Sequence, residues 1–258
     1  MTPGEAFDLS GKAAIVTGGA NGIGRAIALA LGSAGADVFV TARADEEAAV
    51  EVVAQLRGFG VRAAYMLLDG SEDGGAGRLI GEGLGFLGAA DILVNNAATA
   101  ARTPFLDMSE LEYDRTQAVN LRFPFFTLQA FARVLVARGT GGSIINVSSI
   151  SAFKAISRLS AYQCSKAGLS MLTRSAAYEL APHRIRVNTI SPGLTATKSN
   201  RNQWRDDPKL WAERGKDLPL GRPGVPEDFA GAAVFLASDA SRWMTGADLV
   251  VDGGDAVI

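Results

Sequence analysis

The sequence predicts an α/β protein: a parallel sheet of seven strands with helices on both faces. Seven short apolar runs rich in β-branched residues recur along the 258 residues, and segments with helical spacing separate them. The hydrophobic content of 48% is enough for one large core. No linker rich in Pro or Ser and no internal repeat interrupts the chain, so we expect residues 1–258 to form a single domain.

The seven runs have the length and composition of buried strands. Continuous apolar runs are typical of parallel sheets, because helices cover both faces of each strand. In chain order the predicted strands are Ala13–Thr17, Val38–Thr41, Ala63–Leu68, Ile92–Val94, Ser143–Val147, Arg186–Ile190 and Leu249–Val251.

The segments between the runs, such as Arg25–Ala34 and Glu46–Arg57, have helical spacing. Gly70–Gly88 is the exception, because it contains eight glycines. Each glycine inside a helix costs about 1 kcal/mol relative to alanine. We therefore expect a weak or short helix there, held by packing.

Charge and composition exclude several classes of function. The 25 Lys and Arg nearly balance 27 Asp and Glu without a basic stripe, so no nucleic-acid partner is expected. No apolar run reaches the roughly 20 residues of a membrane span, and the N-terminus lacks a signal-peptide pattern. With a single cysteine, Cys164, and a single histidine, His183, the chain cannot build an internal disulfide or a metal site rich in Cys or His. We expect a cytoplasmic protein without a metal, and His183 at a surface helix end.

A glycine-rich turn directly follows the first predicted strand, in the stretch TGGANGIGRAIALAL. Gly18, Gly22 and Gly24 let the backbone N–H groups approach a phosphate, with Asn21 and Ile23 between them. The helix that begins near Ile23 then aims its positive end at the pyrophosphate. A strand before the turn and an amphipathic helix after it favour a doubly wound, Rossmann-type dinucleotide-binding domain over a simple turn.

The end of the second predicted strand bears on the choice of dinucleotide. A carboxylate there would bind the adenosine ribose of NAD, but Ala42 occupies the position and Arg43 follows it. The planar guanidinium of Arg43 suits the 2′-phosphate of NADP. We therefore favour NADP. The alternative is NAD, with Arg43 solvated and Asp45 on the ribose.

Tyr162 and Lys166 stand four residues apart in AYQCSKAG, so on a helix they share one face. They could be polar residues at the rim of an apolar helix. They could also be a proton donor and the cation that tunes it, because the tyrosine pKa of about 10 falls when a cation favours the phenolate.

Five motifs occur in a fixed order along the chain: TGxxxGxG, NNAA at Asn95–Ala98, VN at Val119–Asn120, SS at Ser148–Ser149 and YQCSK at Tyr162–Lys166. Together they resemble those of the short-chain dehydrogenase/reductase family, in its shorter single-domain branch. The resemblance runs from about Leu9 to Gly254. It implies hydride transfer between a nicotinamide dinucleotide and a carbonyl or secondary alcohol.

The resemblance implies a role for each matched catalytic residue. Tyr162 matches the tyrosine that donates or removes the proton at the substrate oxygen. Lys166 matches the lysine that binds the nicotinamide ribose and lowers the tyrosine pKa. Ser149, thirteen residues before Tyr162, matches the serine that hydrogen-bonds the substrate oxygen, and Ser148 fits less well. Asn120 matches the asparagine that holds a water in the proton relay.

Further positions match the family's cofactor site. Asp69 and Asn96 match residues that line the adenosine half, and Thr197 matches a threonine near the nicotinamide amide. Two positions depart from the family pattern. Thr195 stands where an aliphatic residue is usual beside the nicotinamide, and Ala98 replaces a glycine. Neither change argues against activity.

The segment Leu159–Ala181 has small or apolar residues on most helical faces. Such a helix must be covered on more than its sheet side, either within the chain or by another subunit. The resemblance implies a subunit interface, so we expect a homotetramer or homodimer.

The polar segment 198–217 contains Trp204 and Trp211 and resembles the family's mobile segment over the active site. The tryptophans could form a lid over the substrate or anchor a surface helix, and both interpretations stay open. Lys154 is expected to be solvated rather than to contact an anionic substrate.

The leading hypothesis is an NADP-dependent carbonyl reductase or alcohol dehydrogenase with a small-molecule substrate. The whole pattern resembles sugar dehydrogenases and 3-oxoacyl-carrier-protein reductases about equally. The alternatives are a sugar or polyol dehydrogenase that uses NAD, and a catalytically idle dinucleotide-binding sensor. A sensor has no need of all four catalytic residues. Enoyl reduction is disfavoured, because that branch spaces its tyrosine and lysine more widely.

Overall fold

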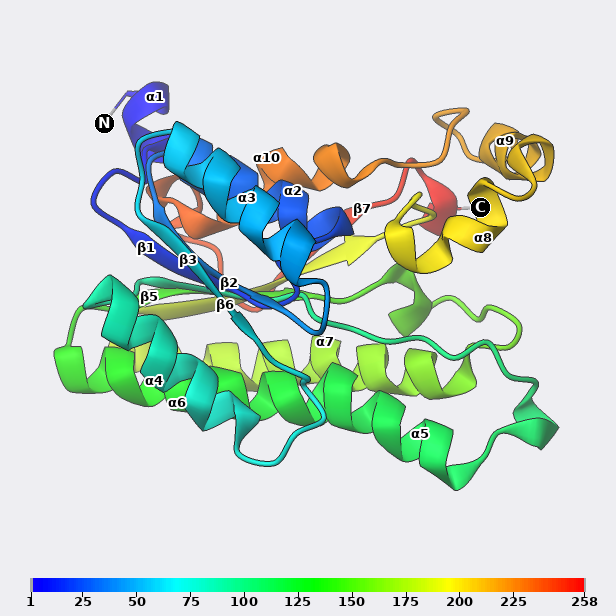
Figure 1. Cartoon of the computed structure of the whole chain (residues 1–258), viewed down its shortest axis with the longest axis horizontal. Coiled ribbons are helices and arrows are strands. Elements are labelled where there is room, and N and C mark those ends of the chain that lie inside the picture. Colours follow the sequence, from blue (N-terminus) through cyan, green and yellow to red (C-terminus); the bar gives the residue numbers. More distant parts are fainter. Residues whose placement is uncertain (1, 258) are drawn as a thin grey trace.

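The computed structural model describes residues 2–257, with the side chains of residues 3, 199, 202 and 203 left aside, and its centre is a parallel sheet of seven strands (Figure 1). The strand order is β3-β2-β1-β4-β5-β6-β7. Each predicted run overlaps one strand, so the predicted fold class is confirmed. The bounds are β1 Ala13–Val16, β2 Asp37–Ala42, β3 Ala63–Leu67, β4 Ile92–Asn95, β5 Gly142–Val147, β6 Ile185–Pro192 and β7 Asp248–Val251.

Two layers of helices cover the sheet, one on each face (Figure 1). Consecutive residues of β1 explain why both faces are apolar: Val16 packs into the core under the first layer and Ile15 into the core under the second. The first layer holds α2 Gly22–Ser33, α3 Glu46–Gly58 and α10 Ala230–Ala237. The second holds α4 Gly75–Leu87, α5 Glu110–Gln117, α6 Phe123–Arg138 and α7 Ser160–Leu180.

Three short helices lie outside these layers. Helices α8 Arg201–Trp204 and α9 Pro208–Lys216 stand beyond the carboxyl end of β6, and α1 Pro3–Phe7 lies at the other end of the molecule (Figure 1).

Helix α4 corrects the expectation of a short helix in the glycine-rich segment. It runs for 13 residues, and packing holds it: Leu79, Ile80 and Leu87 are buried against the sheet. Gly83 lies so close to β1 that an added Cβ would stand 2.8 Å from Cδ1 of Ile15. This glycine therefore lets the helix approach the sheet, and the contact offsets part of the low helix propensity.

The strand order reverses between β1 and β4. From β1 the chain moves outward through β2 and β3, and then returns to add β4 on the other side. In sheets of this kind ligands bind beyond the carboxyl ends of the strands at this switch point. The predicted site residues follow the carboxyl ends of β1 to β6 or lie on helices that begin there, so the topology gathers them at one edge.

Candidate active site

The glycine-rich turn after β1 is packed tightly against the loop after β4. Gly18 has φ +64° and donates its backbone N–H to Oγ1 of Thr41 at 3.0 Å. Asn96 donates from Nδ2 to the carbonyl oxygens of Thr17 and Gly18, at 2.9 and 3.2 Å. A Cβ on Gly24 would lie 2.3 Å from the oxygen of Gly18, so only glycine fits at that position.

The N-terminus of α2 is open toward the cleft. Its first backbone hydrogen bond joins Arg25 N–H to the carbonyl of Asn21 at 3.2 Å, so the N–H groups of Gly22, Ile23 and Gly24 have no intrahelical acceptor. The Asn21 side chain does not cap the helix. The free N–H groups and the positive end of the helix suit a pyrophosphate.

The turn after β2 places Arg43 and Asp45 side by side in sequence but in different environments. Arg43 is exposed and makes no hydrogen bond or salt bridge to any described residue. The Asp45 carboxylate accepts hydrogen bonds from Lys198, from Asn21 at 3.1 Å and from the N–H of Ala48 at 3.3 Å. The bonds to Lys198 and Asn21 lower the pKa of Asp45. The oxygens that the NAD alternative needs for a ribose are thus already engaged.

Asp69, which follows β3, is held in place by its own loop. It accepts hydrogen bonds from the backbone N–H and the hydroxyl of Ser71, at 2.9 and 2.7 Å. The backbone bond to Ser71, with the charges of Arg115 and Arg43, lowers the pKa of Asp69. A fixed, ionised carboxylate therefore stands near Arg43 on the side of the cleft predicted to hold the adenosine.

Asn120 lies in a π-helical turn, Ala118–Arg122, between α5 and α6. Its side chain is fully buried and pairs twice with the backbone of Thr99 at 2.8 Å, once as acceptor and once as donor. It also donates to the hydroxyl of Ser165 at 3.1 Å. The side chain thus ties the loop after β4 to α7, and the π-turn marks a local departure typical of functional sites.

Tyr162 and Lys166 lie on α7, beside the loop after β5. The Lys166 ammonium is buried, donates to the carbonyl of Val147 at 2.7 Å and stands 5.6 Å from the centre of the Tyr162 ring. Ser149 hydrogen-bonds with Tyr162. The Ser148 hydroxyl instead bonds to α7, at 3.1 Å from the Lys166 carbonyl oxygen and 2.9 Å from Ser170. The structure thus leaves Ser149, not Ser148, facing the tyrosine.

The environment of Tyr162 differs from the expectation of a lowered pKa. Burial raises the pKa of the phenol, and the hydrogen bond with Ser149 and the charge of Arg102 only partly oppose it. Burial also lowers the pKa of Lys166 to about 7. The lysine is therefore a weaker cation in this environment than its sequence spacing suggested.

The segment after β6 covers the other side of the cleft. Thr197 lies over the glycine turn, 3.5 Å from the Cβ position of Gly22. The hydroxyl of buried Thr195 donates to the carbonyl of Gly193 at 2.9 Å. Trp204 donates from its indole to the Thr197 carbonyl at 2.9 Å, and Trp211 is buried. Both tryptophans anchor the segment, which favours the second of the two interpretations.

Two other sequence expectations have definite outcomes. Lys154 is not simply solvated: it forms a salt bridge with Asp255 at 2.7 Å, which fastens the loop after Ser149 to the C-terminal turn. The sequence could not show this contact, because 101 residues separate the partners. His183 is exposed at the end of α7, as predicted.

The sequence analysis missed Arg102, whose charge acts on Tyr162, and two further arginines that interact with Arg102. Arg102 follows β4, Arg158 precedes α7 and Arg214 lies on α9. Charge interactions link Arg102 to Arg158, Arg214 and Tyr162. No motif marks these residues. The only available signal was their position in segments that follow β4, β5 and β6.

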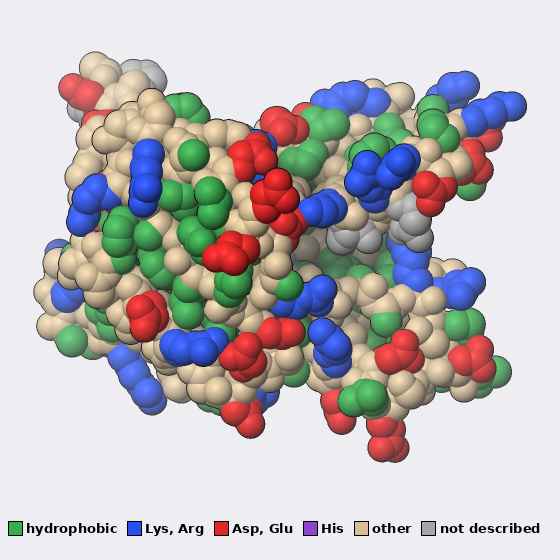
Figure 2. All heavy atoms as spheres, in the orientation of Figure 1, with side chains coloured by type: hydrophobic (Ala, Val, Ile, Leu, Met, Phe, Trp, Pro, Cys, Tyr) green, Lys and Arg blue, Asp and Glu red, His purple; other side chains and the backbone are tan. Residues whose placement is uncertain are grey.

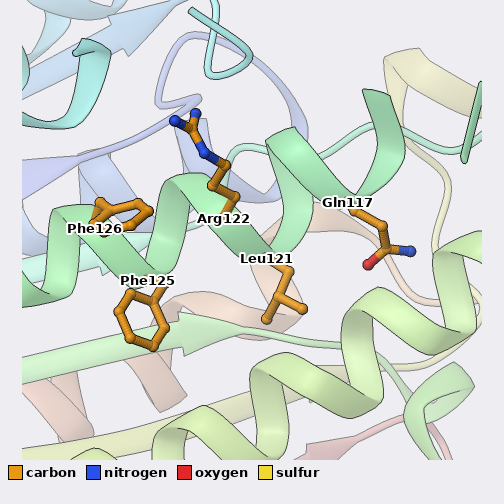
Figure 3. Close-up of a pocket in the computed structure, with 5 residues that line it drawn as sticks. All are labelled: Gln117, Leu121, Arg122, Phe125 and Phe126. Carbon is orange, nitrogen blue, oxygen red and sulfur yellow. The ribbon is translucent and has the colours of Figure 1, made fainter. Parts of the chain in front are cut away.

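A separate pocket lies on the surface of the π-turn and α6 (Figure 3). Its lining contains none of the predicted site residues. Leu121 is also the residue that a Cβ on Gly168 of α7 would meet, at 2.9 Å. The pocket is lined by Gln117, Leu121, Arg122, Phe125 and Phe126.

Comparison with known proteins gives a consistent result. The family model described as "Enoyl-(Acyl carrier protein) reductase" matches residues 18–255. The chain is 39% identical over 249 residues to 2-dehydro-3-deoxy-D-gluconate 5-dehydrogenase of Escherichia coli K12, covering 96% of this chain and 97% of the relative. It is 39% identical over 246 residues to L-rhamnose 1-dehydrogenase (NAD(P)(+)) of Sphingomonas sp. SKA58, covering 95% and 96%.

A solved structure of a short-chain type dehydrogenase/reductase from Mycobacterium marinum superposes with a TM-score of 0.89 at 40% identity, over 97% of each chain. The chain belongs to the short-chain dehydrogenase/reductase family. As such it is an NAD(P)-dependent oxidoreductase that acts on CH–OH or carbonyl groups. Among the described residues of this short-chain dehydrogenase, no helix combines the length and apolarity that crossing a membrane requires.

Proposed function

We propose that this protein transfers a hydride between NADP(H) and a carbonyl or secondary alcohol, with Tyr162 as general acid and base. The observation that carries the proposal is the convergence of Tyr162, Ser149 and Lys166 at the carboxyl edge of the sheet. Asn120 fixes the π-turn beside them. An idle sensor has no use for this arrangement.

The residues present fit a nicotinamide dinucleotide. The open N-terminus of α2 would hold the pyrophosphate, and exposed Arg43 would hold the 2′-phosphate through its planar fork. The nicotinamide, when bound, supplies or accepts the hydride. The other residues that we assign to the cofactor are Gly18, Asn21, Gly22, Ile23, Gly24, Asp69, Asn96, Tyr162, Lys166, Thr195 and Thr197.

The protein's own groups handle the proton. In the direction of reduction the phenol O–H of Tyr162 donates its proton to the substrate oxygen, and the Ser149 hydroxyl donates a hydrogen bond to the same atom. The raised pKa of Tyr162 keeps the phenol protonated at neutral pH. Lys166 titrates near pH 7, so it can exchange a proton in the working range.

We infer that the substrate is a small sugar derivative or polyol. The support is that relatives 39% identical over nearly the whole chain carry names of sugar and sugar-acid dehydrogenases. NAD in place of NADP is the second candidate, because one of these relatives is named for both dinucleotides. The four-residue spacing of Tyr162 and Lys166 and these names together favour CH–OH chemistry over enoyl reduction.

We also propose that residues 1–258 act as one cofactor-binding and catalytic domain, with residues 198–217 as a cover that moves during turnover. A homotetramer or homodimer would use the outer face of α7. Met171 and Tyr178 of α7 are 58% and 87% exposed, and Phe125 of α6 is 43% exposed.

The test of the function is the substitution Tyr162→Phe. Turnover should fall at least about 1000-fold, because the proton donor is lost while the ring is kept. Cofactor affinity, followed by fluorescence, should stay within about twofold, since the phosphate-binding turn is untouched. Turnover near the wild-type rate would overturn the assignment of Tyr162.

A further inference from the structure

Three chain segments bring arginines close enough for their charges to interact, with Arg102 at the centre of the group. Arg102 comes from the loop after β4, Arg158 from the loop before α7, and Arg214 from α9. Arg158 donates to the backbone carbonyl of Arg102 at 3.4 Å, which joins the two loops. The charge of Arg102 acts on the Tyr162 phenol, so this arginine lies within electrostatic range of the reacting hydroxyl.

Two members of this cationic group, Arg102 and Arg158, have no carboxylate partner within residues 2–257. Burial, followed by the charges of Arg214 and Arg158, lowers the pKa of the Arg102 guanidinium. Gathering like charges costs free energy that a bound anion would recover.

The backbone at Arg158 is unusual. Its φ is +65°, and Arg184 is the only other non-glycine residue between 2 and 257 with a positive φ. Side chains rarely tolerate this conformation, so the surrounding structure must enforce it. The result is an exposed guanidinium that is tied to the Arg102 loop instead of extending freely into solvent.

Arg214 approaches from the segment that covers the cleft. Its guanidinium lies over the ring of buried Trp211, 5.3 Å from the ring centre. A cation stacked on a buried ring is restrained. Figure 2 shows a hollow between the part of the molecule that holds α8 and α9 and the part that holds α5, with Lys and Arg side chains on both sides of it.

We propose that the substrate is a small hydroxy or keto acid, whose carboxylate binds Arg102 and Arg158, with Arg214 approaching from α9. The reacting C–O group then lies at Tyr162 and Ser149. This inference rests on the proposed function. The planar guanidinium fork matches a carboxylate with two parallel hydrogen bonds. A neutral sugar would leave Arg102 and Arg158 without a carboxylate partner.

The test compares a panel of aldonic acids with their primary amides as substrates for oxidation with NADP⁺. Each pair has the same hydroxyl groups and differs in charge. For the best acid, kcat/KM should exceed that of its amide about 100-fold. The difference should come from a lower KM for the acid. In Arg102→Ala and in Arg158→Ala this acid-to-amide ratio should fall about tenfold or more. The ratio should be unchanged in Lys12→Ala, which removes a charge before β1 at the opposite edge of the sheet.

The outcomes separate the inference from the proposed function. If the enzyme turns over acids and amides equally well, the inference about the carboxylate is overturned. If that turnover is also lost in Tyr162→Phe, the proposed function still stands. A loss of kcat for both members of each pair in Arg102→Ala would make Arg102 a residue that tunes Tyr162, and would also overturn it.

Binding gives a readout that does not need turnover. Calorimetry of Tyr162→Phe with NADP⁺ present should show the acid binding at least tenfold tighter than the amide. When Arg102→Ala and Arg158→Ala are added to Tyr162→Phe, this difference in affinity should disappear. Equal affinities would overturn the inference. Selective acid binding in an enzyme that oxidises none of the panel would instead overturn the proposed oxidation.

Discussion

Lys198 and Asp45 form a salt bridge that joins the segment after β6 to the turn after β2, across 153 residues of sequence. The bridge places a carboxylate next to the proposed 2′-phosphate site and holds a cation, Lys198, at the same place. Asp45 also caps α3 through the N–H of Ala48.

Asp45→Asn should raise the affinity for NADPH severalfold over that for NADH, because it removes a negative charge near the phosphate while keeping Lys198. Asparagine is as good an N-cap as aspartate, so the free energy of unfolding should change little. Asp45→Ala is the control, and should cost about 1 kcal/mol through the lost cap. Fluorescence titration and urea unfolding measure the two effects. Weaker NADPH binding in Asp45→Asn would contradict the proposed position of the phosphate.

Arg43→Ala should lower the affinity for NADPH about tenfold or more and the affinity for NADH less than about twofold. Only NADPH carries the 2′-phosphate that the guanidinium would bind. Arg43→Lys should lie between, since it keeps the charge but not the fork. Titration of both dinucleotides checks this. Equal losses would show that Arg43 does not distinguish them.

Lys166 predicts a pH dependence of stability in the cofactor-free protein. Its pKa is about 7 when folded, against 10.5 for the ordinary side chain. Between these pH values the unfolded chain holds a proton that the folded protein lacks, so the free energy of unfolding should rise with pH. Below pH 7 both states are protonated and the contribution of Lys166 is constant.

Urea unfolding at pH 7 and pH 9, with Lys166→Met as the matched variant, isolates this contribution. Wild type should gain stability relative to Lys166→Met between the two pH values. An unchanged difference would mean that buried Lys166 keeps its ordinary pKa.

The exposed face of α7 predicts a homo-oligomer in solution. Light scattering should return a dimer or tetramer mass, and Met171→Lys should reduce it, because a charge would be buried in the interface. Phe59→Lys is the control, because Phe59 is similarly exposed, at 51%, but lies at the end of α3 in the other layer. A monomer mass for the wild type would contradict the interface.

The sequence predicted those features that local spacing determines. The apolar runs located all seven strands, and the interval from Tyr162 to Lys166 placed both residues on one helix. Contacts between segments that are distant along the chain could not be predicted from the sequence. The salt bridge of Lys154 with Asp255 is one example, and the group of arginines around Arg102 is another. The pKa of Tyr162 was misjudged for the same reason, because burial depends on the packed surroundings and not on the spacing of two residues.

The contact of Gly83 with Ile15 has a consequence for the order of folding. A helix with so many glycines has little stability of its own and cannot act as a nucleus. We therefore expect helix α4 to form after β1 has assembled in the sheet, by docking on a surface already present. In this β3–α4–β4 crossover we expect the sheet to form before the helix that connects its strands.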